Sequence, residues 1–229
     1  VSHINKRIPL VTGCGSNSTQ EAIELVEHAH GVGSDYALVI TPYYNKPTQE
    51  GLYQHFKVIA DSVNIPIIIY NVPSRTGSNI LPETTARLYK ECSNIVGIKE
   101  ASGSLDQITK LMSLVDENFL LFSGGDEVNL PILAAGGVGA VSVVANIVPK
   151  ETHKLVASFL EGNLQESRRL QFYLYELIKT LFIETNPIPV KTALGLMGKI
   201  EPNLRLPLCR MTDAGLTKLK DVLKKYNLI

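Results

Sequence analysis

The amino-acid sequence predicts an α/β protein with a parallel sheet, followed by a region of helices alone. Six short apolar runs alternate with segments whose apolar residues recur at helical spacing, and each pair has about the length of a βαβ crossover. The runs are apolar throughout, as expected for strands that are covered on both faces. From Pro149 onward the pattern is helical only.

The first two strands are predicted at 8–13 (IPLVTG) and 36–41 (YALVIT). Between them, Ser18 to Glu21 has the pattern of a capping box, and glycines at 31 and 33 end the helix that it begins. The helix after the second strand carries four apolar residues on one face, Leu52, Phe56, Ile59 and Ala60. These segments form two βα units.

The third and fourth strands are predicted at 66–70 (PIIIY) and 95–101 (IVGIKEA), and the helix between them has Pro82 near its first position. Side chains alternate along a strand, so Lys99 shares a face with Gly97. Gly97 is therefore expected to leave open space beside the lysine.

The fifth and sixth strands are predicted at 119–122 (FLLF) and 139–145 (GAVSVVA), with a short helix at 127–135 between them. In the helical region, one helix stops at Gly162 and a long one continues to Leu181. The segment 186–191 (NPIPVK) is expected to be a break before a last helix at about 213–225.

Composition and charge exclude several classes of protein. Lys plus Arg and Asp plus Glu both number 22, so no net field attracts nucleic acid or an anionic membrane. No apolar run reaches the roughly 18 residues of a membrane helix, and the first residues lack the apolar centre of a signal peptide. The three cysteines are widely spaced and odd in number, which favours reduced thiols. We expect a soluble, cytoplasmic protein with a small-molecule partner.

Unusual polar and glycine residues collect where the predicted strands end. In a parallel α/β sheet or barrel, the carboxyl ends of the strands are where catalytic residues lie. The residues at these ends are Cys14, Asn17, Tyr43, Tyr44, Tyr70, Arg75, Lys99, Gly124, Asp126, Ser142 and Asn146.

Lys99 ends an otherwise apolar strand. Loss of solvent disfavours the charged form of a lysine, and the neutral amine is a nucleophile toward carbonyl carbon. This predicts Schiff-base chemistry, although a lysine taken alone more often only marks a strand end and reaches water. Tyr70 follows three isoleucines, where a phenol can pass protons, or can be a core tyrosine with a satisfied hydroxyl.

Arg75 lies in a loop bounded by proline and glycine and is suited to bind a carboxylate with two hydrogen bonds, although isolated loop arginines are more often solvated. Tyr43 and Tyr44 form either an aromatic hydrogen-bonding pair or a packed loop. The five histidines include no helical i, i+4 pair, so we predict no metal site. The run 13–18 lacks the third glycine of a dinucleotide-binding loop.

Four motifs then occur in order: TPYYNKP, YNVPSRTG, GIKEA and NPIPVK. Together they resemble the dihydrodipicolinate synthase family, class I aldolase-type lyases related to N-acetylneuraminate lyase. The resemblance covers essentially the whole chain. It implies a (β/α)8 TIM barrel with a C-terminal helical domain, in a homotetramer that is a dimer of dimers. It also implies condensation of pyruvate with L-aspartate 4-semialdehyde to 4-hydroxy-tetrahydrodipicolinate, in the diaminopimelate route to lysine.

The resemblance assigns catalytic roles residue by residue. Lys99 would form the Schiff base with pyruvate, with no other cofactor and no metal. Tyr70 would relay protons, Arg75 would help to bind a substrate carboxylate at the entrance, and Tyr44 would reach across a tight dimer into the neighbouring site.

The remaining residues that match are at the pocket wall and at a regulatory site. Gly124 and Val141 would line the pocket, the latter through its backbone carbonyl. Asn17, Glu21 and Tyr43 match positions of the lysine-feedback site, although a capping box accounts for Glu21 without an effector.

The chain departs from the family in its number of strands, since six are predicted and the family has eight. We expect a partial (β/α) barrel at 1–161 and a C-terminal helical domain at 162–229, without the first two βα units and their Gly-Thr-Thr-Gly-Glu loop. The Val1 start favours a fragment of a longer protein over a part supplied by another chain. The alternatives in function are another pyruvate-dependent aldolase, for sialic acid or keto-deoxy sugar acids, and a truncated, non-catalytic relative that binds small acids.

Overall fold

The computed structural model describes residues 1–229 and contains one six-stranded parallel sheet. Each strand is hydrogen-bonded to the next in chain order. The strands are β1 (Val11–Cys14), β2 (Tyr36–Ile40), β3 (Ile67–Asn71), β4 (Ile95–Glu100), β5 (Leu120–Ser123) and β6 (Gly139–Ala140). The six parallel strands confirm the prediction. A sequential order without reversal is that of a barrel wall rather than of a doubly wound sheet.

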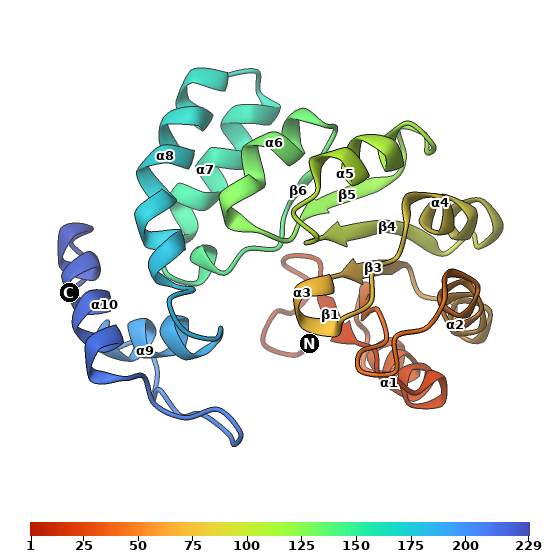
Figure 1. The fold of residues 1–229 in the computed structure, drawn as a ribbon, viewed down its shortest axis with the longest axis horizontal. Helices are drawn as coiled ribbons and strands as arrows, with labels where there is room; N and C mark the ends of the chain where they lie inside the picture. The colour runs from red at the N-terminus through yellow and green to blue at the C-terminus, as the bar shows by residue number, and fades with distance from the viewer. The chain divides into compact units, whose positions relative to one another are not determined.

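Helices α1 (Thr19–Gly31), α2 (Gln49–Ser62), α4 (Pro82–Glu91) and α5 (Leu105–Met112) lie together on one side of the curled sheet (Figure 1), as right-handed crossovers require. The single turn α3 (Pro73–Thr76) lies at the carboxyl end of β3, not among these helices, and α6 (Asn129–Ala134) follows β5. The consecutive residues Ile67, Ile68 and Ile69 of β3 are all buried, so both faces of the sheet are covered. This is why the strands are apolar throughout.

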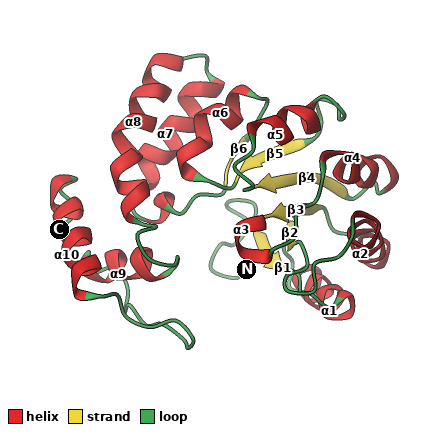
Figure 2. Ribbon diagram, viewed as in Figure 1, coloured by secondary structure: helices red, strands yellow, loops and turns green.

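The chain divides into two compact units, and all six strands belong to the first. The first unit comprises Val1–Gly125 and Pro131–Ala140, and the second comprises Asp126–Leu130 and Val141–Ile229. Figure 2 shows helices and loops from residue 149 to the C-terminus, as predicted. The 3₁₀ turns are η1 (Asp126–Val128) and η2 (Val144–Asn146), and the helices after them are α7 (Pro149–Leu160), α8 (Leu164–Thr180), α9 (Ile188–Leu196) and α10 (Asp213–Lys225).

Two strand predictions are wrong in their bounds. The first strand begins at Val11 rather than residue 8, because Leu10 is already bonded to Asp35, whose carboxylate accepts its N–H at 2.7 Å. The sixth strand ends at Ala140 rather than residue 145. Beyond it, the N–H groups of Val143 and Val144 donate to the Asp126 carboxylate, each at 2.9 Å, instead of to a strand.

The NPIPVK segment is only in part a break. Helix α9 begins within it at Ile188, with Pro187 as its N-cap residue. Proline is tolerated in the first turn of a helix, because the N–H that it lacks would have no partner there. The two prolines of the motif therefore start a helix rather than prevent one.

Gly97 does not leave open space beside Lys99, contrary to expectation. A Cβ at this position would lie 2.1 Å from the carbonyl oxygen of Leu120, its partner on β5. The register of β3 and β4 also shifts between Ile67 and Ile68, which skips one residue of β4. After this bulge, strict alternation places Gly97 and Lys99 on one face and Ile98 and Glu100 on the other.

Candidate active site

Tyr70 and Lys99 lie side by side at the carboxyl ends of β3 and β4. Each is the second-last residue of its strand, and the parallel register pairs them directly. The Lys99 Nζ is 3.9 Å from the centroid of the Tyr70 ring, and both residues are half-buried. A cationic nitrogen at this distance is attracted by the negative face of the ring. The structure thus brings together an amine and a phenol at neighbouring strand ends.

The surroundings of Tyr70 keep its phenol protonated. Burial raises the pKa of the Tyr70 hydroxyl above its ordinary value of 10.0, and the positive charge of Arg75 opposes this shift. At neutral pH the hydroxyl can therefore donate a proton or a hydrogen bond. Arg75 is exposed on α3, which Pro73 begins and which Gly77 ends at a φ of 73°. This tight turn keeps the guanidinium near enough to Tyr70 to affect its pKa.

Gly124 follows β5 and packs against the end of β4. Its backbone N–H donates to the carbonyl of Glu100 at 2.8 Å. A Cβ at residue 124 would lie 2.6 Å from the Cβ of Ala101 and 3.0 Å from the Glu100 carbonyl oxygen. The loop after β5 can pass this close to the residue after Lys99 only because residue 124 has no side chain.

Tyr43 and Tyr44 project from the loop after β2. Tyr44 is 88% exposed and has a φ of 73°, and its N–H donates to the carbonyl of Thr76 at 3.3 Å. Tyr43 is exposed as well. The alternative of a packed loop therefore does not describe Tyr44, whose side chain is almost wholly exposed.

Of the three residues of the predicted feedback site, Asn17 and Tyr43 lie on the loops after β1 and β2, and Glu21 lies in the first turn of α1. The carbonyl of Asn17 accepts a hydrogen bond from the Asn45 side chain at 2.9 Å, which ties these loops together. Only one of the two hydrogen bonds of the predicted capping box forms. The Ser18 hydroxyl accepts from the Glu21 N–H at 3.4 Å, whereas the Glu21 carboxylate accepts from the Ser16 hydroxyl at 2.6 Å.

Val141 belongs to the second compact unit, directly after β6. It is partly exposed. Its predicted place at the wall of the pyruvate pocket stays a prediction.

Comparison with known proteins decides the family. The model of the dihydrodipicolinate synthetase family matches residues 1–226. The chain belongs to this family. The resemblance predicted from the four motifs is therefore confirmed.

Relatives and solved structures of the family match the whole chain. The 4-hydroxy-tetrahydrodipicolinate synthases of Syntrophus aciditrophicus (strain SB) and Geobacter sp. (strain M21) are 55% and 53% identical over 229 residues, which are 100% of this chain and 78% and 79% of the relatives. The dihydrodipicolinate synthase of Aquifex aeolicus matches with a TM-score of 0.98 and 48% identity, over 100% of this chain and 78% of that chain.

Two further solved structures of the family contain a bound small molecule. The chloride-inhibited enzyme from Acinetobacter baumannii is complexed with pyruvate and matches with a TM-score of 0.95 and 44% identity, over 99% of this chain and 77% of that chain. The enzyme from Cyanidioschyzon merolae has lysine bound and matches with a TM-score of 0.93 and 39% identity, over 96% of this chain and 75% of that chain.

Sequence reasoning missed two buried polar residues beside the synthase motif residues. Asn71 and Glu100 are the last residues of β3 and β4, and their exposed fractions are 0% and 1%. The sequence held one indication: alternation places residue 100 on the same face as Ile98, where a carboxylate requires hydrogen-bond donors. The identity of those donors depends on the fold.

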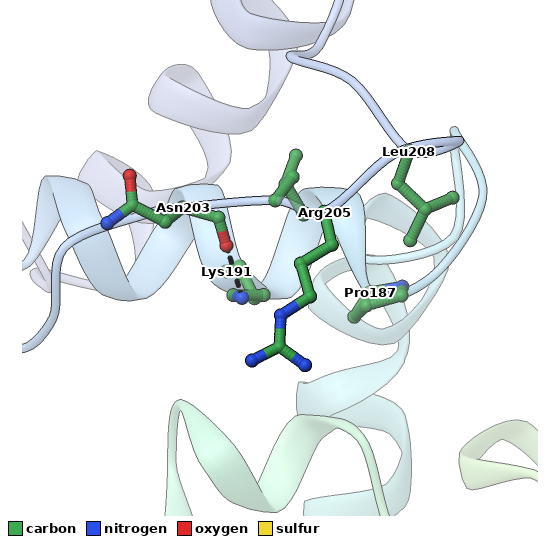
Figure 3. A pocket seen from close by; sticks show the side chains of 6 residues that line it. Pro187, Lys191, Asn203, Arg205 and Leu208 are labelled. Atoms are coloured by element: carbon green, nitrogen blue, oxygen red, sulfur yellow. Dashed lines mark hydrogen bonds between the residues drawn. The ribbon is translucent and has the colours of Figure 1, made fainter.

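A separate hollow of about 430 Å³ lies within the second unit (Figure 3). Its lining residues are Pro187, Lys191, Asn203, Leu204, Arg205 and Leu208. The Lys191 ammonium already donates to the carbonyl of Asn203, as the dashed line in Figure 3 marks. The lysine of the NPIPVK motif thus ties the 203–208 loop to α9.

No cluster of three or more His, Cys, Asp or Glu residues is arranged to hold a metal ion. No helix has both the length and the apolar character needed to cross a membrane.

Proposed function

We propose that this chain is a 4-hydroxy-tetrahydrodipicolinate synthase, a lyase whose Schiff-base lysine is Lys99. The observation that carries the assignment of Lys99 is its register pairing with Tyr70, with the amine 3.9 Å from the ring. The relatives at 55% and 53% identity bear the synthase name, which favours this activity over the sialic-acid, sugar-acid and non-catalytic alternatives.

The chemistry begins at the amine of Lys99. Its neutral form attacks the keto carbon of pyruvate, and loss of water gives an imine. Removal of a proton from the methyl group then gives an enamine, whose carbon attacks the aldehyde of aspartate semialdehyde. Tyr70, whose pKa is raised by burial, supplies and recovers protons during these steps. The exposed guanidinium of Arg75 binds a carboxylate of the substrate.

The pocket and its partners extend this assignment. Gly124 supports the pocket wall, because it brings the loop after β5 against the end of β4. Val141 contributes its carbonyl. Tyr44, which is 88% exposed, enters the site of a second copy in a dimer of dimers. The complete fold is a (β/α)8 barrel, to which 1–161 contribute, with a C-terminal helical domain at 162–229. The enzyme works in the cytoplasm and needs no added cofactor.

We further infer that Asn17, Glu21 and Tyr43 bind lysine as a feedback inhibitor. Two observations support this inference. Asn17 and Tyr43 lie on loops that the Asn45–Asn17 hydrogen bond joins, and Glu21 lies in the first turn of α1, four residues after Asn17. The related enzyme from Cyanidioschyzon merolae has lysine bound.

Borohydride trapping tests the proposed function. The full chain is incubated with pyruvate, reduced, digested and analysed by mass spectrometry, with a Lys110→Arg variant as control because Lys110 is an exposed lysine of the following helix. We expect a reduced pyruvate adduct on Lys99, its loss in Lys99→Arg and its retention in Lys110→Arg. Folded protein without an adduct would contradict the proposal. Steady-state rates with aspartate semialdehyde, sialic acid and keto-deoxy-gluconate distinguish the synthase from other aldolases.

A further inference from the structure

The carboxylate of Glu100 is buried beside the Schiff-base lysine and held by amide groups. Its Oε1 accepts from the Ser102 N–H at 2.6 Å and from Asn71 Nδ2 at 3.2 Å. Its Oε2 accepts from Asn71 Nδ2 at 3.0 Å and from Gln107 Nε2 at 3.2 Å. A carboxylate can be buried only when such donors replace water, and here both oxygens have them. Gln107 lies on α5, so the carboxylate faces the helices.

Asn71 and Glu100 join the same two strands as Tyr70 and Lys99, one residue further along. The register pairs Tyr70 with Lys99 and Asn71 with Glu100. Because side chains alternate, the reacting pair lies on one face of the sheet and the amide–carboxylate pair lies on the other. The hydrogen bonds from the Asn71 amide to the Glu100 carboxylate therefore link the ends of β3 and β4 on the face opposite Lys99 and Tyr70.

Two backbone N–H groups fix the direction of this hydrogen-bond network. The Ile80 N–H donates to Asn71 Oδ1 at 3.2 Å, so the amide of Asn71 must turn its NH₂ group toward Glu100 and Asn79. At the other end, the Ser102 N–H requires an acceptor at residue 100. Between these ends, the side-chain amides of Asn79 and Gln107 exchange hydrogen bonds at 2.9 and 3.2 Å. The network is complete because residue 100 only accepts.

We propose that Glu100 and Asn71 are positioning residues that set the approach of Lys99 to Tyr70. The proposal rests on the proposed function, since it concerns the same reaction. The two strand ends are joined by the backbone bond from the Ala101 N–H to the Asn71 carbonyl at 2.9 Å and by the Asn71–Glu100 side-chain contact, so loss of the side-chain contact lets the strand ends shift relative to each other. A displacement of about 1 Å in reacting groups lowers rates by about 100-fold.

Glu100→Gln tests the need for an acceptor at this position. The side-chain amide of Gln at position 100 has one NH₂ group. In either orientation of the amide, this NH₂ group faces N–H donors that bonded to the Glu100 carboxylate, so donor faces donor. Turning the neighbouring amides to accept from it would set the NH₂ group of Asn71 against the Ile80 N–H. We expect kcat to fall by about 100-fold, with slower borohydride trapping of pyruvate on Lys99.

The double variant Asn71→Asp with Glu100→Gln moves the carboxylate across the network. The carboxylate at position 71 accepts from the Ile80 N–H, from the turned amide of Asn79 and from the new amide at position 100. That new amide still offers its oxygen to Ser102 and donates to the turned amide of Gln107. Every donor regains an acceptor, so we expect kcat to recover to within about 10-fold of the wild type, which independent effects would not give.

Asn94→Ala is the matched control, because Asn94 precedes β4 at its other end. Its side chain donates to the carbonyls of Ala60 and Val63 at 2.9 and 2.8 Å. We expect this variant to lower the midpoint of thermal unfolding while kcat and the KM for pyruvate stay within about 3-fold of the wild type, since the reacting groups do not move.

Several outcomes would overturn the proposal. They are a wild-type kcat in Glu100→Gln, a double variant that folds but is no faster than the single variant, and an equal loss of kcat in Asn94→Ala. If Glu100→Gln does not fold, the double variant decides alone, and a folded protein that traps pyruvate supports the proposal. A wild-type chain that traps no pyruvate contradicts the proposed function itself and is seen before any variant is made.

Discussion

Replacement of Gly97 by alanine is expected to force β4 and β5 apart two residues before Lys99. The added Cβ would lie 2.1 Å from the carbonyl oxygen of Leu120 and 2.7 Å from its Cβ. The colliding oxygen is backbone in a paired strand, so no side-chain rotation relieves the overlap. Overpacking of a core costs about 1–3 kcal/mol, and we expect the upper end of about 3 kcal/mol here. For a protein of this size, that lowers the midpoint of thermal unfolding by about 6–12 °C.

Gly13→Ala is the matched control for this prediction. Gly13 is a strand glycine as well, but a Cβ there would meet no atom within 4 Å. We expect its stability to stay equal or to rise by about 0.4–1 kcal/mol, because alanine restricts the unfolded chain. Urea and thermal unfolding of both variants measure the difference, and borohydride trapping reports on Lys99. If Gly97→Ala is as stable as Gly13→Ala, the close contact between residue 97 and Leu120 does not exist.

Three further predictions concern the site and its surroundings. Gly124→Ala should lower kcat by about 10-fold or more, because its Cβ would meet the Cβ of Ala101 at 2.6 Å and displace the end of β4; an unchanged kcat would contradict this. Tyr70→Phe should keep pyruvate trapping but lower kcat by about 100-fold, as expected for loss of a proton-transfer group. Burial lowers the pKa of His55 to about 4, below its ordinary 6.5, so its contribution to stability is full above pH 6.5 and is lost as the pH falls toward 4. Urea unfolding at pH 7 and pH 4.5 should show at most about 3 kcal/mol of this loss in the wild type and none of it in His55→Gln.

Much of the sheet could be predicted from the sequence because both of its faces are covered. Three consecutive buried residues such as Ile67, Ile68 and Ile69 leave a continuous apolar run that is visible without the fold. The same apolar pattern predicted that Tyr70 and Lys99 lie close together, because the carboxyl ends of parallel strands meet at one edge of the sheet. These predictions needed only strand type and direction.

Two predictions that failed or held only in part depend on side-chain hydrogen bonds that the apolar pattern does not reveal. The sixth strand is short because a carboxylate at residue 126, far along the chain, takes the N–H groups of Val143 and Val144. The capping box forms in half because the hydroxyl of Ser16 reaches Glu21. Apolar periodicity carries no information on such competition between a ladder and a side chain.

The Lys99–Glu100 dipeptide shows why a charged pair at a strand end has two separate roles. Alternation turns the amine toward Tyr70 and the carboxylate toward α5, so neither side chain can take the place of the other. An apolar residue at position 100 would fill the space but would leave the N–H of Ser102 and an N–H of Asn71 without acceptors, which costs about 1–3 kcal/mol for each buried group. A residue that supplies a donor fails for the same reason. With asparagine at position 71, the buried position therefore requires a carboxylate for hydrogen bonding, while the reaction requires the lysine. The register of β3 and β4 pairs Asn71 with Glu100 directly beside the pair of Tyr70 and Lys99.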